Sequence, residues 1–313
     1  MRSLIIFALV GLGAQIVDGA LGMAFGVTAS TLLVLSGVAA AQASAAVHLA
    51  EVGTTLASGL SHWRFKNIDW KIVLKLGVPG AIGAFLGATV LSSLSTEDAA
   101  PLMAGILLAI GVYVLLRFSL RTPPAFRSGS TPHTAKFLTP LGLFGGFIDA
   151  SGGGGWGPIT TSTLLSRGKT APRTVIGSVS ASEFLVAVSA SLGFLVGLRE
   201  DFLHNIPIVL GLAAGGVIAA PLAAWLVSKV SPALLGTAVG GVIVLTNAQK
   251  LLKYFGIHGA ASTAIYTTIA VLWAGLVVYA WRTSRAPEYL PEALDSEAPA
   301  EEELADEPDT AVR

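Results

Sequence analysis

Four acidic residues lie inside apolar segments of the chain, as two pairs whose members are separated by nearly the same interval. Asp18 is paired with Asp149, each just before a glycine-containing turn, and Glu51 is paired with Glu183. A carboxyl group in such surroundings can exchange a proton or accept hydrogen bonds from backbone N–H groups. Two interpretations of each aspartate stay open: a cap on the helical arm that follows, or a group that binds and releases a proton.

His48 precedes Glu51 by less than one helical turn, so the two side chains share a helix face. Glu51 and Glu183 are read either as members of a proton relay or as buried, hydrogen-bonded struts. No third ligand accompanies His48 and Glu51, and we expect neither a metal ion nor any other cofactor.

Glycines and hydroxyls follow both aspartates. Glycine allows positive φ and leaves backbone N–H groups uncovered, and the N-terminus of a helical arm attracts anions. Pro158 suits the first turn of such an arm. Neutral hydroxyl donors come next in both copies, among them Thr28, Ser30, Thr160 and Thr161. This combination is typical of a site for a small oxyanion.

The composition indicates a membrane setting for these residues. Only 12% of the 313 residues are charged, 53% are hydrophobic, and the mean hydropathy is +0.73, whereas a soluble domain has about 25% charged residues. Apolar runs of about 20 residues recur, as in a polytopic membrane protein. The absence of cysteine excludes thiol chemistry, and the basic residues cluster in loops, a pattern of membrane orientation and not of nucleic-acid binding.

The chain divides into two similar stretches. Residues 11–31 match residues 142–162, and residues 72–88 match residues 208–224. The fold predicted is an all-α polytopic membrane protein with two inverted repeats, each a glycine-broken re-entrant hairpin plus three transmembrane helices, and one extra C-terminal helix. The expected parts are repeat 1 at 1–119, an inner basic linker at 120–136, repeat 2 at 137–252, the last transmembrane helix at 253–286 and a disordered acidic tail at 287–313.

Loop charges favour hairpins over crossing segments. With hairpins, and therefore seven full spans near 40–62, 70–94, 99–118, 174–198, 203–227, 232–250 and 261–282, Lys and Arg divide fourteen to four between the two faces. With crossing segments they divide twelve to six. The positive-inside rule therefore predicts an outside N-terminus and a cytoplasmic C-terminus. Glycines at helical spacing, such as Gly80, Gly83 and Gly87, are expected to let helices approach closely.

Several motifs resemble one family. They are the duplicated Gly-rich hairpin, the loop 61-SHWRFKNIDWK-71 followed by 80-GAIGAFLGA-88, and 152-GGGGWGPITTSTLL-165 followed by 172-PRTVIGSVSASEF-184. They resemble the TauE/SafE sulfite exporter family over residues 4–282. Two departures are 19-GALGMAF-25, where a fuller Gly run is usual, and Ser178-Val179, where the family commonly shows Thr-Ser.

The resemblance implies a permease of the cell inner membrane for sulfite, organosulfonates or related sulfur anions. The anion site would lie at the hairpin tips and at the start of the following spans, and Arg173 would either draw anions to the inner mouth or serve as an orientation charge. The candidate substrate-binding residues are Gly22, Thr28, Ser30, Gly153, Gly154, Gly155, Trp156, Thr160, Thr161 and Ser178. The proton-coupling candidates are Asp18, Asp149, Glu51, Glu183 and His48.

Two other functions are compatible with these residues. A passive anion channel would use the same donors without coupling. An intramembrane enzyme would bring Asp18 and Asp149 together as a catalytic dyad, although proteolysis does not explain the glycine and hydroxyl runs. The chain has no G-x-x-x-x-G-K-[ST] motif, so we expect no ATP site of that kind. The expected partners are a small sulfur oxyanion and the lipid bilayer.

Overall fold

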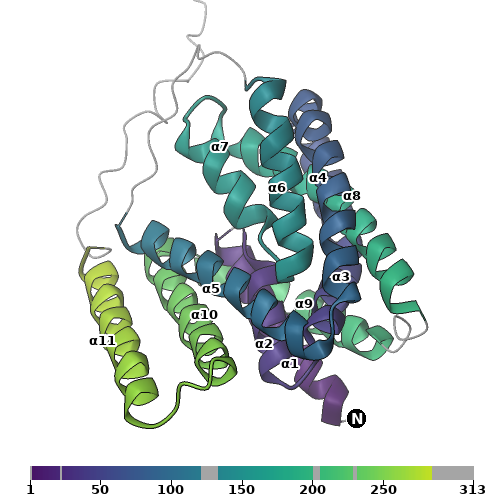
Figure 1. Cartoon of the computed structure of the whole chain (residues 1–313). Coiled ribbons are helices and arrows are strands. Elements are labelled where there is room, and N and C mark those ends of the chain that lie inside the picture. Colours follow the sequence, from purple (N-terminus) through teal and green to yellow (C-terminus); the bar gives the residue numbers. More distant parts are fainter. Residues whose placement is uncertain (1, 22, 121–132, 200–204, 228–230, 284–313) are drawn as a thin grey trace, which may run out of the picture.

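The computed structural model describes residues 2–21, 23–120, 133–199, 205–227 and 231–283, and these residues are helical apart from short connections. The acidic tail at 287–313, most of the linker at 120–136 and Gly22 lie outside the described residues. The helices (Figure 1) are α1 (Arg2–Leu21), α2 (Phe25–Leu35), α3 (Ala40–Arg64), α4 (Trp70–Ser93), α5 (Thr96–Leu120), α6 (Ala135–Gly152), the π-helix η1 (Gly157–Thr161), α7 (Ser162–Ser166), α8 (Pro172–Leu198), α9 (Ile206–Val227), α10 (Pro232–Tyr254) and α11 (Gly259–Thr283).

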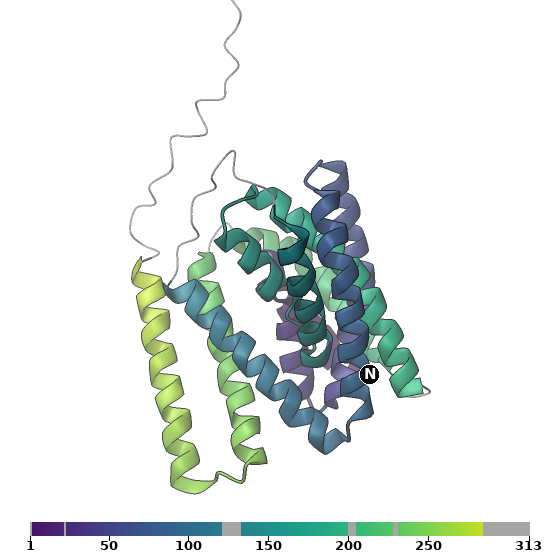
Figure 2. The same cartoon turned by 45° about the horizontal axis from the view of Figure 1, so that its top comes forward.

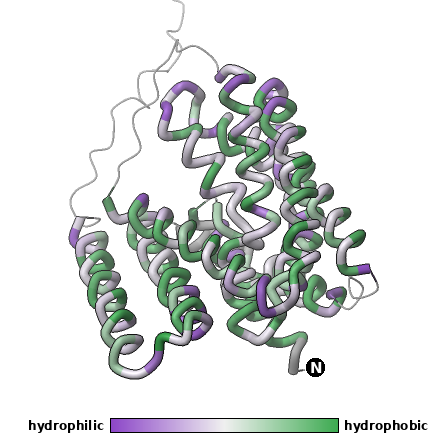
Figure 3. The backbone as a smooth tube through the Cα atoms, viewed as in Figure 1, coloured by the Kyte–Doolittle hydropathy of each residue, from purple (hydrophilic) through white to green (hydrophobic). Residues whose placement is uncertain are grey.

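Within the described residues, five helices are long and apolar enough to cross a membrane: α4, α5, α8, α10 and α11. Figure 3 shows hydrophobic residues along most of the helices and hydrophilic ones mainly near their ends and in connections. The 25-residue helix α3 is less apolar because it carries buried polar residues, including His48 and Glu51. The protein is therefore a polytopic membrane protein whose described residues form helices and short connections, as the composition predicts.

The first glycine-containing segment folds back on itself. Helix α1 ends at Leu21 and α2 begins at Phe25, with Ala24 in the left-handed region at φ 95°. A Cβ at Gly13 would lie 3.7 Å from the Leu32 side chain, which places the middle of α1 beside the far end of α2. The two arms are therefore antiparallel.

The second glycine-containing segment also folds back on itself, through a turn with more glycines. Gly153, Gly154 and Gly155 have φ values of 72°, 144° and 148°, which favour glycine over residues with a Cβ. A Cβ at Gly145 would lie 3.1 Å from Thr160 Cγ2, so α6 and η1 are antiparallel as well. The arm after the turn starts as a π-helix, with Pro158 near its N-terminus.

The first arm of each hairpin packs closely on a helix from the other half of the chain. Helix α6 lies along α4 and α1 along α9. A Cβ at Gly83 would overlap the carbonyl oxygen of Leu143, and a Cβ at Gly11 would overlap that of Leu212. The packing role predicted for Gly80, Gly83 and Gly87 is confirmed, because a Cβ on any of them would overlap α6 or Trp156.

Helices α3 and α8 pack against each other between these pairs, while α10 packs on α5 and α11. In Figures 1 and 2, α10 and α11 stand side by side at one edge of the molecule. The α3–α8 pair is antiparallel, since Ser58 near the end of α3 bonds to Ser180 near the start of α8 and His48 lies beside Phe194.

Candidate functional site

The tips of the two hairpins touch each other. A Cβ at Gly26, at the start of α2, would lie 2.8 Å from Gly154 Cα. A Cβ at Gly157, at the start of η1, would lie 3.0 Å from Met23 Cβ. The Ser30 hydroxyl also donates a hydrogen bond to the carbonyl of Gly153. These contacts join the two turns into one unit.

Asp18 and Asp149 occupy equivalent places in this unit. Asp18 Oδ1 accepts a hydrogen bond from the N–H of Phe25 at 3.1 Å, and Asp149 Oδ1 accepts one from the N–H of Trp156 at 2.8 Å. Each aspartate thus binds one of the N–H groups that the start of a helical arm leaves unpaired. The predicted capping role is confirmed for both residues, and a role in proton binding stays a prediction.

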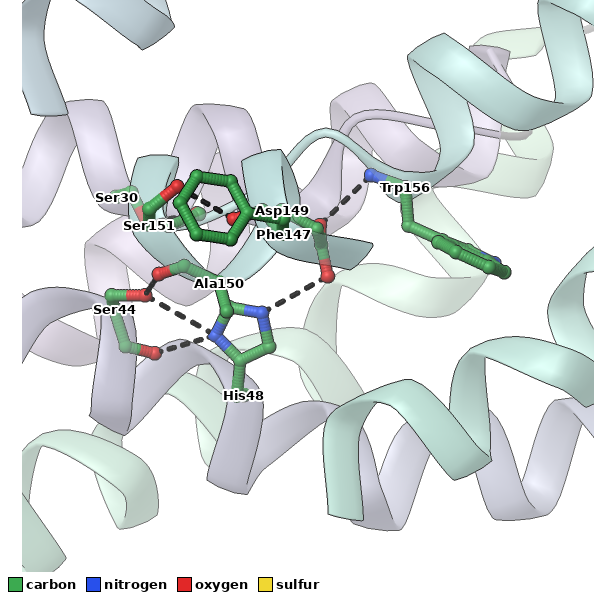
Figure 4. A network of polar contacts seen from close by, with 9 residues as sticks. Ser30, Ser44, His48, Phe147, Asp149, Ala150, Ser151 and Trp156 are labelled. Carbon is green, nitrogen blue, oxygen red and sulfur yellow. Dashed lines mark hydrogen bonds and ion pairs between the residues drawn. The ribbon is translucent and has the colours of Figure 1, made fainter. Parts of the chain in front are cut away.

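Asp149 is also bonded to His48, in a network enclosed by α3 and α6 (Figure 4). His48 Nε2 lies 3.0 Å from Asp149 Oδ2, and His48 Nδ1 lies 2.8 Å from the carbonyl oxygen of Ser44. The Ser44 hydroxyl donates to the carbonyl of Ala150 at 2.6 Å. Both members of the pair are buried, with relative exposures of 0% for His48 and 2% for Asp149.

This geometry requires a proton in the contact between His48 and Asp149. The Ser44 carbonyl can only accept, so the hydrogen in that bond is on Nδ1 of His48. An unprotonated Nε2 and a carboxylate are both acceptors, so the 3.0 Å contact requires one proton between them.

A polar cavity of about 210 Å³ lies on the other side of the joined tips. It is bordered by the turn after α1, the start of η1, the C-terminal part of α3 and the N-terminal half of α8. Its lining residues are Asp18, Met23, Ala24, Ser58, His62, Gly157, Thr161, Ile176, Val179, Ser180 and Glu183. Asp18 and Glu183 both line the cavity, and both are less buried than Asp149 and Glu51.

The chemistry of the cavity lining combines acids with hydroxyls. Asp18 and Glu183 supply the carboxyl groups, and Ser58 and Ser180, whose Oγ atoms lie 2.8 Å apart, supply hydroxyls together with Thr161. None of the described residues lining this cavity is Lys or Arg. A ligand here meets hydroxyl groups that donate or accept and carboxyl groups that can hold a proton.

Comparison with known proteins identifies the family. The family described as "Sulfite exporter TauE/SafE" matches residues 7–250. The chain belongs to the TauE/SafE family. It is 50% identical over 280 residues to the "Probable membrane transporter protein YtnM" of Bacillus subtilis (strain 168), which covers 89% of this chain and 93% of that protein. The "Probable membrane transporter protein YdhB" of the same organism is 25% identical over 194 residues, covering 61% of this chain and 79% of that protein. The comparison with solved structures found no match.

In this TauE/SafE protein, Glu51 lies behind the joined tips. Glu51 is 4% exposed, and a Cβ at Gly26 would lie 2.9 Å from its Oε1. Its counterpart Glu183 lines the cavity. The two glutamates are thus both close to the hairpin tips, but of the two only Glu183 lines the cavity. A role of either residue in a proton relay stays a prediction.

Some predicted binding residues lie elsewhere in this TauE/SafE fold. The buried Ser178 hydroxyl accepts a hydrogen bond from the N–H of Asp69 at 2.8 Å, and so ties the α3–α4 connection to α8. Thr28 is buried, and its Oγ1 has no hydrogen-bond partner among the described residues. It lines a separate, apolar cavity of about 410 Å³ bordered by α1, α2, α10 and α11. Thr160 donates to the carbonyl of Trp156, and Arg173 is exposed at the start of α8. Gly22 lies outside the described part of the chain.

The cavity includes three polar residues that the sequence motifs did not single out: Ser58, His62 and Ser180. The interval from Glu51 to Glu183 could have drawn attention to them, since it also relates His48 to Ser180 and His62 to Phe194. Within the described residues, no hydrogen bond joins Asp18 to Asp149, and no group of three or more His, Asp or Glu side chains is placed to hold a metal ion. The aspartate-dyad hypothesis therefore gains no support from this geometry.

Proposed function

We propose that this protein is a secondary transporter of small sulfur oxyanions, such as sulfite or organosulfonates, in the cell inner membrane. The anion binds in the cavity at the hairpin tips, near the middle of the membrane. Membership of the TauE/SafE family and the 50% identity to a probable membrane transporter support transport as the activity. The observation that carries the site is the cavity itself, to which both tips contribute and whose lining combines hydroxyl and carboxyl groups.

Hydroxyl groups and the starts of the two second arms hold the anion. Ser58, Ser180 and Thr161 face the cavity and can donate to the oxygens of a sulfite or sulfonate group. Ala24 and Gly157, where the second arms begin, supply backbone dipoles. Neutral donors bind an oxyanion without the strong attraction of a buried arginine, which favours release on the other side.

The acidic lining couples anion binding to a proton. An anion beside an ionised carboxylate at about 4 Å is repelled by about 4 kcal/mol in a partly solvated protein site. Asp18 and Glu183 both face the cavity, and no Lys or Arg lining it offsets them among the described residues. The anion therefore enters when at least one of these carboxyl groups is protonated, and anion and proton move together.

The proposed architecture follows the same pattern. The chain is two inverted repeats with seven full spans, and the hairpins enter the membrane from opposite sides. The N-terminus is outside and the C-terminus is cytoplasmic, because this orientation places most Lys and Arg on the inner face. Inverted hairpins explain why their tips touch and why their capping bonds are equivalent.

The test is flux of labelled sulfite and sulfoacetate into proteoliposomes, with and without an inward proton gradient. We expect saturable uptake that increases as external pH falls, and Glu183→Gln should reduce the response to pH. Glu97→Gln, an exposed glutamate outside the cavity, is the matched control and should behave like the wild type. Absence of uptake of both anions contradicts the substrate class. Uptake that neither saturates nor responds to pH indicates a passive channel instead.

A further inference from the structure

The cavity has a counterpart position at the other end of the α3–α8 pair. Asp18 is related to Asp149, and Glu51 to Glu183, by nearly the same interval along the chain. The interval between the glutamates also relates three cavity residues to positions in the opposite half: Ser180 to His48, Ser58 to Ala190 and His62 to Phe194. Because α3 and α8 are antiparallel, the two sets of side chains lie at opposite ends of the pair.

The counterpart position is filled. His48, Ala190 and Phe194 are each 0% exposed, and the rings of His48 and Phe194 have centroids 6.1 Å apart. On the cavity side, Ser180, Ser58 and His62 are all partly exposed. The same pair of helices and the same type of hairpin turn thus enclose a cavity at one end and a solid core at the other.

The difference between the filled end and the open end follows from side-chain size at two related positions, His48 and Ser180. The imidazole of His48 reaches Asp149 and fills the space between α3 and the second hairpin. Ser180 stands in the same relation to Asp18 but lacks the ring, and both residues line open space. Phe194 behind His48 adds bulk, whereas His62 at its counterpart is partly exposed at the edge of the cavity.

We propose that the residue pair His48 and Ser180 decides on which side of the hairpin tips there is room for substrate. His48, backed by Phe194, is a plug on the side away from the α3–α4 connection. Ser180 leaves open space on the side where α3 connects to α4. His48 is thereby a positioning residue for the transport path and not a ligand of the substrate.

For transport, which rests on the proposed function, the plug must leave its place. This movement breaks the bonds of His48 to Asp149 and to the Ser44 carbonyl and separates the His48 ring from Phe194. The Ser180 side has no such bonds to Asp18 among the described residues and needs no such step to admit substrate. The structure is therefore open on the Ser180 side, where no ring fills the space, and closed on the other side by the ring of His48, which must move for transport.

The absence of cysteine from the chain allows a direct test. Single cysteines replace Ser58, which lines the cavity, and Ala190, its counterpart, and are labelled with a membrane-impermeant maleimide in right-side-out and inside-out vesicles. Lys66→Cys, at an exposed position in the α3–α4 connection, marks the side of the cavity. We expect Ser58→Cys to react from the side on which Lys66→Cys reacts, and Ala190→Cys to react from neither.

The swap variants decide the proposal. His48→Ser should raise labelling of Ala190→Cys, from the side opposite to Lys66→Cys, by about tenfold or more, because it shifts the population toward a form that is rare in the wild type. Ser180→His should lower labelling of Ser58→Cys by a similar factor, and the double swap should exchange the two patterns. Unchanged labelling of Ala190→Cys in a folded His48→Ser protein overturns the proposal.

Folding of each variant is checked by gel filtration and by thermal unfolding followed through tryptophan fluorescence. If His48→Ser does not fold, Phe194→His replaces it, because this substitution copies His62 and removes the bulk behind the plug. It should also expose Ala190→Cys, and failure to do so counts against the proposal. Labelling needs no substrate. If the swap variants exchange the labelling pattern but the protein carries neither sulfite nor sulfonate, the proposal on His48 and Ser180 stands and only the proposed substrate class is refuted.

Discussion

The two hairpin turns share one local geometry and differ in what surrounds it. In both, an aspartate at the end of the first arm caps the start of the second. The turn after α6 is enclosed: Asp149 is 2% exposed and bonded to His48. The turn after α1 borders a cavity, and Asp18 is partly exposed there. The capping bond is therefore common to both hairpins, while the neighbouring helices decide whether its aspartate lies in a core or beside a cavity.

The largest expected effect comes from Gly154 in the enclosed turn. Its φ is 144°, and a Cβ would overlap the backbone of Gly26 and Val27. Gly154→Ala should therefore cost about 4 kcal/mol of stability or prevent folding, since it combines strain with a backbone clash. Thermal unfolding in detergent measures the loss.

Gly37 provides the matched control for that substitution. It has φ 93°, and nothing lies within 4 Å of the position that a Cβ would take, so Gly37→Ala carries the conformational cost alone, about 1 kcal/mol. Equal losses for Gly37→Ala and Gly154→Ala would show that the contact between the hairpin tips is not tight.

The next effect separates the two aspartates by stability. Asp149→Ala removes the partner of the Trp156 N–H and of Nε2 of His48, both buried, which should cost about 3 kcal/mol. Asp18→Ala removes a cap at the edge of the cavity, which should cost about 1 kcal/mol. Unfolding temperatures of the two variants give the ranking, and the reverse ranking would contradict the burial difference. Asp149→Asn, which can still bond to Trp156 and His48, should stay near the wild type.

A third effect separates the aspartates by pH dependence. If Asp18 carries the coupled proton, sulfite uptake should rise by up to about tenfold for each unit by which pH falls, as expected for one linked proton. Asp18→Asn keeps the cap and should flatten this slope. Asp149→Asn should keep the slope, because the His48–Asp149 pair faces away from the cavity. Initial rates measured across the range from weakly acidic to weakly basic pH test both, and an unaltered slope in Asp18→Asn would assign the proton elsewhere.

The smallest effect would make the first turn resemble the second. Ala24 adopts φ 95°, a conformation that suits glycine. Ala24→Gly should therefore stabilise the protein by about 0.5 kcal/mol, because relief of strain slightly exceeds the greater entropy loss of glycine. Ala264→Gly, exposed in α11, should instead destabilise by about 1 kcal/mol. A lower unfolding temperature for Ala24→Gly would mean that the turn is not strained.

The helices were predictable from the sequence because their signals are local. The spans expected near 40–62, 70–94 and 174–198 are α3, α4 and α8 within a few residues. The arms of both hairpins and the caps at Asp18 and Asp149 follow from the spacing of an acid, a glycine turn and an apolar run. The close glycine contacts between helices follow from helical spacing of small residues.

The composition of the cavity could not be predicted in the same way. Ser58 and His62 face it only because α3 crosses α8 in one particular register, and that register depends on packing between distant segments. Ser178 was expected near the anion, but its hydroxyl is bonded to the backbone of Asp69, a contact between distant segments that no local pattern indicates. The π-helical start of the second arm at Gly157 also depends on tertiary contacts, since it gives no periodic signal of its own.

The glycine-lined crossings between the halves have a mechanical consequence. Backbone contact fastens α1 to α9 and α6 to α4, so a hairpin arm cannot slide without carrying a helix that belongs to the opposite half of the sequence. Each of these packed pairs, α1 with α9 and α6 with α4, therefore contains one helix from each half of the sequence. A movement that separated the two halves of the sequence would break these crossings, whereas movement of each packed pair as a unit preserves them.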